Sequence, residues 1–311
     1  GITGVMEMYL DPNAIQDAFT ECGMRNVQVS GINKFGPSLE ELENRYVKLN
    51  GRNDLSSFML GFHAEYTCSR ELLESISQMA HKYQAPVFMH NSETASEVKE
   101  CVDRYGVTPT VLFDQLGIFD YGGGGYHCVH MSDDDFAVMK KRDLTAVTNP
   151  ASNLKLASGI CPTSRFLKEG IRMAIGTDGP ASNNCLDMFR EMFLVTGLAK
   201  YRDQDASSTD ADDVLYMATV NGAKAMGLSD CETLSVGSKA DIIMIDLHMP
   251  NMQPVHNIPK NIVYAGSKQN VKMTMIDGKI LYEDGNFHIG VDPEDVYREC
   301  EKISKRLYQE D

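Results

Sequence analysis

The sequence predicts an α/β fold: a (β/α)8 TIM-type barrel that is missing its first strand and carries a small C-terminal β appendage, part of a β-sandwich. Three observations support this prediction. Short runs rich in β-branched and apolar residues alternate with longer amphipathic stretches, which is typical of βα units around a parallel sheet. Seven such units are present up to Asp178, one fewer than an eight-stranded barrel needs. Beyond Asp178 the chain changes to two helical stretches followed by short strands.

The predicted barrel strands are short, and most are separated by a helical stretch. We expect the strands at residues 3–9, 26–32, 58–63, 86–90, 125–131, 144–148 and 172–177. We expect helices between them at 14–21, 39–49, 70–83, 95–105 and 133–142. Ser69 and Glu71 mark the beginning of the third helix, because an N-cap hydroxyl and an acidic first turn both stabilise a helix N-terminus.

The part after Asp178 should hold two helices, a small sheet and a final helix. The helices are expected at 187–200 and 210–226, the strands at 240–246, 261–265, 271–276 and 279–282, and the last helix at 293–308. Asp277-Gly278 is a strong hairpin signal between two of these strands. We therefore divide the chain into a barrel at 1–236, a partial β-sandwich at 237–290 and a C-terminal helix at 291–311.

A four-glycine run at 122–125 precedes the fifth predicted strand. No Lys-Ser/Thr pair follows it, as a phosphate-binding loop would require. We interpret the run as a flexible turn that enters a strand.

The formal net charge of −15 disfavours nucleic acid and anionic membrane surfaces as partners, so a small molecule is expected. Eight cysteines are scattered without a C-x-x-C pair, which is typical of reduced thiols in the cytoplasm. No apolar run approaches the roughly 18 residues of a membrane span. The chain opens at Gly1, directly on the first predicted strand, which indicates an N-terminal truncation or a processed chain.

Polar side chains end several of the predicted strands, where a barrel keeps its active site. His63, His90 and Asp178 lie at such ends, and His127 lies within the fifth run. Neutral imidazole and carboxylate groups are suitable ligands for Zn²⁺ or Fe²⁺. A water molecule bound to such a metal reaches a pKa near 7. Glu93 follows His90 closely enough to move a proton to or from the same water.

The other histidines are weaker candidates. His130 lies three residues after His127, beyond the predicted strand, and a direct role for it is less favoured. The remaining histidines fall in helix or appendage positions and are interpreted as structural or solvated: His81, His248, His256 and His288.

Several motifs resemble the amidohydrolase superfamily, and in particular its branch of methylthioadenosine/S-adenosylhomocysteine deaminases and chlorohydrolase-like enzymes. The resemblance covers essentially the whole chain. It rests on Gly61-Phe-His-Ala-Glu-Tyr-Thr-Cys68, His90-Asn-Ser-Glu-Thr94, His127-Cys-Val-His130, Asn149-Pro-Ala-Ser-Asn-Leu-Lys-Leu-Ala-Ser-Gly159, Gly176-Thr-Asp-Gly-Pro-Ala-Ser-Asn-Asn184 and Gly237-Ser-Lys-Ala-Asp-Ile-Ile-Met-Ile-Asp246.

The resemblance implies a role for each candidate residue. His90 and Asp178 would be ligands of one divalent metal, zinc or alternatively iron. Glu93 would carry protons to the leaving amine, His127 would orient or polarise the attacking water, and His63 would contact the substrate. Asp178 would be a catalytic residue as well as a ligand. The implied reaction is deamination of a purine nucleoside or base. Guanine deaminase and triazine chlorohydrolase activities are the alternatives, because pocket residues choose among them.

The sequence departs from the family in the residues that would complete the metal site. No His-x-His pair, which supplies two ligands in the family, occurs in the 311 residues. Phe62, Glu65 and Thr148 replace residues that are usually Pro, Pro and His. We therefore expect weak metal binding, association into a homo-oligomer through open sheet edges, and little deaminase activity. The alternative from another class is an inactive fragment that serves as a binding or assembly module.

Overall fold

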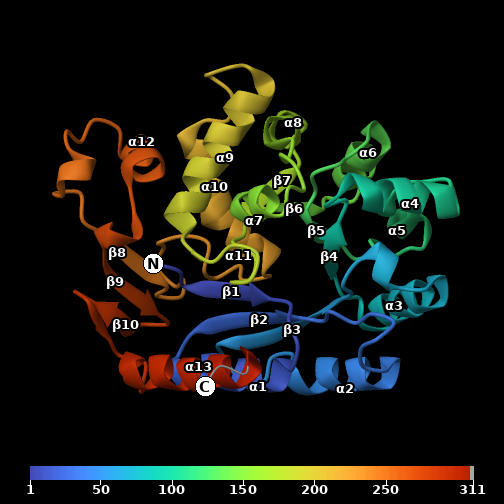
Figure 1. The fold of residues 1–311 in the computed structure, drawn as a ribbon, viewed down its shortest axis with the longest axis horizontal. Coiled ribbons are helices and arrows are strands. Elements are labelled where there is room, and N and C mark those ends of the chain that lie inside the picture. Colours follow the sequence, from blue (N-terminus) through green and yellow to red (C-terminus); the bar gives the residue numbers. More distant parts are fainter. Residues whose placement is uncertain (309–311) are drawn as a thin grey trace.

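The computed structural model describes residues 1–308, and its main feature is a curled parallel sheet with helices on its outer side (Figure 1). The seven strands follow one another in sequence order across this sheet. Among the described strands, the first and the seventh each pair with one neighbour only. The strands are β1 (Gly4–Glu7), β2 (Arg25–Val29), β3 (Ser56–Gly61), β4 (Val87–Asn91), β5 (Gly123–His127), β6 (Thr145–Thr148) and β7 (Arg172–Ile175).

All the helices predicted between the strands are present, and three further short α-helices and one turn of 3-10 helix occur. The unpredicted α-helices are α5, α7 and α8, each only six or seven residues long. Two of them begin at a proline. Proline lacks a backbone N–H, and the first turn of a helix tolerates this because an N–H at that position would have no partner within the helix. The helices of this part are α1 (Pro12–Cys22), α2 (Leu39–Leu49), η1 (Glu65–Thr67), α3 (Arg70–Tyr83), α4 (Ala95–Tyr105), α5 (Pro109–Gln115), α6 (Asp133–Lys141), α7 (Pro150–Lys155) and α8 (Thr163–Lys168).

The glycine run corrects one prediction. Only Gly122 belongs to a turn, and Gly123 and Gly124 lie in β5. A Cβ atom would approach the carbonyl oxygen of Val87 to 2.0 Å at Gly123 and that of Thr145 to 2.1 Å at Gly124. The glycines are therefore needed for close approach of the neighbouring strands, not for flexibility.

The fifth strand also ends earlier than predicted. We expected it to continue to residue 131, but it stops at His127. His127 and Cys128 have φ values of 70° and 48°, a left-handed conformation that turns the chain out of the sheet. His127 consequently stands at a strand end.

Two helices replace the single one predicted at 210–226. After α9 (Met188–Asp203), α10 (Ala211–Ala218) stops at Thr219 and α11 (Val220–Ala225) follows. Thr219 has φ −121° and ψ −88°, which breaks the helical backbone.

The C-terminal part forms a second, antiparallel sheet in the order β11-β10-β9-β8. Its strands are β8 (Ile242–Ile245), β9 (Val271–Ile276), β10 (Lys279–Glu283) and β11 (Asn286–Phe287). The Asp277-Gly278 turn is confirmed, with both residues at positive φ. The strand predicted at 261–265 is wrong: the chain there is helical, because Asn257 caps a helical stretch that begins at Ile258. The short helices are η2 (Pro250–Met252), α12 (Ile258–Lys260), η3 (Asn261–Ala265) and η4 (Lys268–Asn270).

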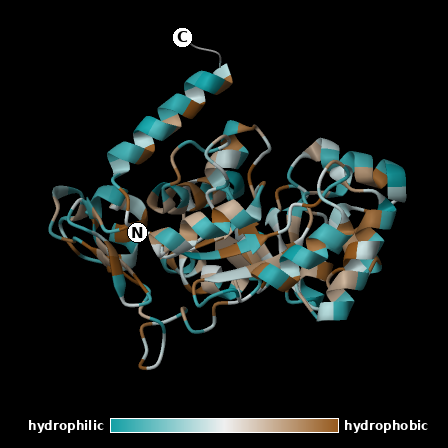
Figure 2. Ribbon diagram, turned by 90° about the horizontal axis from the view of Figure 1, so that it is seen from below, coloured by the Kyte–Doolittle hydropathy of each residue, from teal (hydrophilic) through white to brown (hydrophobic). Residues whose placement is uncertain are grey.

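The final helix, α13 (Pro293–Tyr308), is present as predicted and buries none of its residues. Figure 2 shows it standing away from the rest of the molecule. None of the helices within residues 1–308 is long and apolar enough to cross a membrane.

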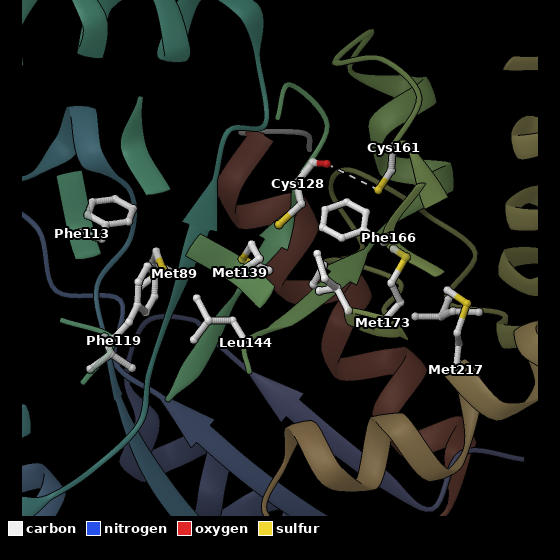
Figure 3. Packing of buried hydrophobic residues seen from close by; sticks show 14 of the residues in the cluster. Met89, Phe113, Phe119, Cys128, Met139, Leu144, Cys161, Phe166, Met173 and Met217 are labelled. Carbon is white, nitrogen blue, oxygen red and sulfur yellow. Dashed lines mark hydrogen bonds between the residues drawn. The ribbon is translucent and has the colours of Figure 1, made fainter. Parts of the chain in front are cut away.

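The main core lies between the parallel sheet and the outer helices (Figure 3). Met89 and Met173 from two strands are buried there with Met139, Phe166 and Met217 from three helices. A smaller cluster fills part of the concave side of the sheet, around Val29, Phe88, Val147, Ala174 and Ala225. The concave side therefore keeps room for a pocket above this cluster.

Candidate active site

A pocket of about 680 Å³ opens along the concave side of the parallel sheet and reaches the carboxyl ends of its strands. Four of the residues that the sequence singled out line it: His63, His90, His127 and Asp178. They come from four different strands or from the loops directly after them. The structure thus brings these side chains together, as strand ends of a barrel should.

His90 lies near the end of β4, between two other imidazoles. Its ring centroid is 4.7 Å from that of His63 and 5.3 Å from that of His127. Its Nδ1 lies 2.8 Å from the carbonyl oxygen of His63. A carbonyl only accepts, so Nδ1 carries the proton and Nε2 keeps its lone pair. Burial lowers the pKa of His90 to about 3, helped by His127 and His63, so the ring is neutral at pH 7.

His127 is 1% exposed and is held in the same tautomer. Its Nδ1 lies 2.7 Å from Oδ1 of Asn153, which accepts the proton. Its Nε2 lies 3.7 Å from Oε2 of Glu93. Its remaining nitrogen therefore faces the carboxylate predicted to move protons.

Asp178 follows β7 and is fixed by neighbouring donors. Ser152 donates from its hydroxyl to Oδ2 over 2.5 Å, and the N–H of Gly179 donates to Oδ1 over 2.7 Å. Burial raises the pKa of Asp178, but the hydrogen bonds from Ser152, Gly179 and Ser182 outweigh it and bring the pKa below its usual value. The group is a carboxylate over the whole neutral range.

Glu93 lies in the loop between β4 and α4, held from two sides. Its Oε1 accepts from the hydroxyl of Ser158 over 3.1 Å. Its backbone N–H donates to Oε2 of Glu97 over 2.8 Å. Glu97 also accepts from the N–H groups of Ser92 and Thr94, and burial raises its pKa to about 7. The buried carboxylate of Glu97 thus shapes the loop that presents Glu93.

His63 lies two residues beyond β3, at the rim of the site. Its Nδ1 is 3.1 Å from the hydroxyl of Thr67, and its ring meets Tyr66 edge to face at 6.0 Å. Burial lowers its pKa. A half-buried aromatic group here is able to contact a bound molecule.

The other histidines stay outside the pocket. His130 donates from Nε2 to the carbonyl of Ser158 over 2.7 Å, and so supports the residue that contacts Glu93. His81 contacts the carbonyl of Ser77 on α3 and the carboxylate of Asp120 in the turn after α5. The others are exposed, as predicted: His248, His256 and His288.

Sequence reasoning missed several groups of this site. Glu7 is the last residue of β1 and lines the pocket, but the strand predicted at 3–9 concealed its place at a strand end. Asn153 and Ser152 lie on the unpredicted helix α7. The hydroxyl of Tyr126 is buried without a hydrogen-bond partner beside the pocket.

The donor chemistry fits a divalent metal, because two imidazoles present lone pairs and Asp178 is ionised. A ligating histidine usually donates its other N–H to a carbonyl or carboxylate, as His90 does to a carbonyl here. Within residues 1–308, however, no three His, Cys, Asp or Glu side chains form a group that could hold a metal. His90 and Asp178 would hold the metal with fewer protein ligands than a closed site has.

Comparison with known proteins adds a family, two relatives and one solved structure. The model of the amidohydrolase family matches residues 1–281. A 5-methylthioadenosine/S-adenosylhomocysteine deaminase of Caldanaerobacter subterraneus subsp. tengcongensis is 38% identical over 315 residues, which cover 99% of this chain and 72% of the relative. A 5'-deoxyadenosine deaminase of Methanothermobacter thermautotrophicus is 36% identical, over 93% of this chain and 69% of the relative.

The solved structure is a zinc-bound adenosine deaminase from Xanthomonas campestris. It has a TM-score of 0.93 at 30% sequence identity, covering 99% of this chain and 72% of that one.

Proposed function

The chain belongs to the amidohydrolase family, and from this premise we propose that it removes the amino group of a purine nucleoside or base by hydrolysis, in the manner of methylthioadenosine/S-adenosylhomocysteine deaminases. The observation that carries the proposal is the convergence of His90, His127 and Asp178 in the pocket, with Oε2 of Glu93 lying 3.7 Å from Nε2 of His127. The names of the similar proteins support the same reaction class.

In this proposal the metal is zinc, with iron as the alternative, and His90 and Asp178 hold it. When bound, it supplies an activated water as the nucleophile. The net reaction adds water to the ring carbon that bears the amino group and releases ammonia.

Side chains of the protein take the remaining roles in the reaction. Glu93 takes a proton from the attacking water and returns it to the departing amino group, which needs a carboxylate within reach of both. His127 orients that water through Nε2, since Asn153 occupies its Nδ1. His63 contacts the purine ring from the rim of the site.

Guanine deaminase and triazine chlorohydrolase activities remain the alternatives for the same site. One observation favours a non-catalytic binding or assembly module: the described residues supply no three-ligand metal group. The proposed deaminase and the non-catalytic module differ in whether added zinc produces turnover.

We also propose that the chain is a homo-oligomer of the cytoplasm. β1 and β7 each have one edge without a strand partner among the described strands, and such edges favour pairing with another chain. All eight cysteines are free thiols, which suits a reducing compartment.

The test is an ammonia-release assay on methylthioadenosine, adenosine and guanine with added zinc, run beside light scattering. We expect turnover of the nucleosides at a rate limited by zinc occupancy, from an associated species. Absence of ammonia from all three at saturating zinc would overturn the proposed activity and favour the module.

A further inference from the structure

The last helix, α13, has an apolar face that no other described residue covers. None of its 16 residues is buried, and Figure 2 shows it projecting away from the rest of the molecule. Three of its large apolar side chains stay in contact with water: Val296 is 42% exposed, Ile303 46% and Leu307 69%. A helix of this length is only marginally stable in water by itself, so its apolar face is expected to pack against a partner.

The apolar side chains of α13 form a single line along the helix. They are four, three and four residues apart and consist of Val296, Cys300, Ile303 and Leu307. We call these four residues the seam. The same alternation of four and three marks the core positions of a two-stranded coiled coil, in which side chains of one helix fit between those of the other. The spacing therefore favours a second helix as the occupant of the seam.

The charges of α13 indicate which helix this is. The half at 293–300 has three acidic residues and one basic residue, whereas the half at 301–308 has one acidic and three basic residues. A second copy of α13 laid antiparallel would place the acidic half of each helix beside the basic half of the other. A parallel copy would place like charges together, which is unfavourable. Antiparallel packing also brings the positive end of each helix dipole beside the negative end of the other.

An antiparallel copy has a register in which the whole seam is paired. Val296 of one copy then faces Leu307 of the second copy, and Cys300 faces Ile303 of the second copy. Two-fold symmetry repeats both contacts, so each of the four seam residues gains an apolar neighbour. No seam residue is left facing water in this register.

The same register pairs opposite charges at the border of the seam. Glu299 and Arg306 lie on the same side of the helix next to the seam, because both directly precede a seam residue. In the antiparallel pair Glu299 of one copy lies opposite Arg306 of the second copy, twice over. Within one chain Glu299 contacts Lys302 at 2.6 Å, but both side chains are mostly exposed and such a pair is weak. Glu299 is therefore able to exchange this contact for the one across the interface.

We propose that α13 docks antiparallel against α13 of a second copy of this chain along the seam. The inference does not depend on the proposed deaminase reaction. It gives the proposed homo-oligomer a specific interface that differs from the edges of β1 and β7. One pair of four-turn helices is a small interface, so the dimer should be in reversible equilibrium with the monomer.

Sedimentation equilibrium over a range of protein concentrations measures the Kd of the dimer. Ile303→Gln combined with Leu307→Gln removes apolar side chains from the seam and should raise this Kd by at least about tenfold. Tyr308→Gln removes an apolar side chain that is 75% exposed but lies off the seam, so it should leave the Kd unchanged. Because α13 buries none of its residues, the thermal unfolding of all variants should match that of the wild type, which shows that they fold.

A charge exchange tests the orientation of the two helices. Arg306→Glu places two carboxylates opposite each other at both border contacts and should weaken the dimer. Adding Glu299→Arg restores opposite charges there and should return the Kd to the wild-type value. Arg298→Glu makes the same charge change as Arg306→Glu on the side of α13 away from the seam, and should not weaken the dimer. In a parallel pair positions 299 and 306 do not face each other, so the second substitution would not rescue the first.

The outcomes separate this inference from the other proposals. A wild-type chain that stays monomeric at every concentration overturns the docking of α13 and the proposed homo-oligomer together, whatever the result of the ammonia-release assay. A dimer with an unchanged Kd in the Ile303→Gln, Leu307→Gln variant overturns the docking of α13 alone and assigns association to another surface. A dimer that is weakened by that variant but not rescued by the charge exchange overturns the antiparallel arrangement.

Discussion

The imidazole of His90 donates its Nδ1 proton to the backbone carbonyl of His63 over 2.8 Å, so its Nε2 lone pair faces the pocket. The two residues belong to neighbouring strand ends, and β3 and β4 are paired in register beneath them. The backbone just after one strand therefore fixes the tautomer of a side chain on the next strand.

His90→Ala should weaken zinc binding by more than about tenfold. Removing only the hydrogen-bond partner of a metal ligand already lowers metal affinity by about that factor, and removing the ligand itself should cost more. Equilibrium dialysis with metal analysis measures it. His248→Ala removes an exposed imidazole outside the site and is the control. Equal zinc affinity in the His90 variant and the wild type would remove His90 from the ligand set.

Glu93→Gln should reduce turnover by at least about 10²-fold, since an amide cannot carry the proton. Zinc content and the unfolding transition should not change, because the amide still accepts from Ser158. Glu21→Gln, at an exposed position on α1, is the matched control. Wild-type rates in the Glu93 variant would mean that another group moves the proton.

Glu97→Gln should alter the pH dependence of stability. Burial raises the pKa of Glu97 from 4.5 to about 7 in the folded chain. Between these values the folded state holds a proton that the unfolded state has lost, so the wild type loses stability as pH rises through this window. The glutamine does not titrate, so the variant does not lose stability in this pH window.

The measurement is urea unfolding of both proteins at about pH 5 and about pH 8. The stability of the variant relative to wild type should rise between the two conditions, by an amount on the order of 2 kcal/mol. A constant difference would show that Glu97 is already ionised at the lower pH.

The order of the strands could be predicted because each strand is a short apolar run followed by an amphipathic helix. That His63, His90 and His127 line one pocket could be predicted for the same reason, since a parallel sheet brings strand ends together. The helical stretch at 261–265 was mistaken for a strand because Ile262 and Val263 favour strands locally, whereas the cap at Asn257 lies outside that run.

The groups that support the site could not be predicted, because their pairings depend on how loops and short helices fold back. Asn153 is 26 residues from His127, and Ser158 is 65 residues from Glu93. Nothing in the local sequence links such partners. Gly123 and Gly124 were misjudged because close approach to neighbouring strands is a tertiary constraint.

A buried ion pair joins the parallel sheet to the smaller one, and its removal should be costly. Nε of Arg25, in β2, lies 2.5 Å from Oδ2 of Asp241, just before β8, and both side chains are 3% exposed. Asp241→Ala leaves the guanidinium buried without its partner, so we expect a loss of about 3–5 kcal/mol in the free energy of unfolding. Glu74→Ala breaks the exposed Arg70–Glu74 pair instead and should have an effect below about 1 kcal/mol.

The double variant Arg25→Met with Asp241→Leu separates the pair's own contribution from the effect of stranding a charge. Removing both charges avoids the uncompensated guanidinium, so the double variant should be more stable than Asp241→Ala alone. Urea unfolding of the three variants and the wild type gives the comparison. If the double variant were the least stable, the ion pair itself would be the stronger contribution, and the attachment of β8 to the barrel would depend on it rather than on apolar packing.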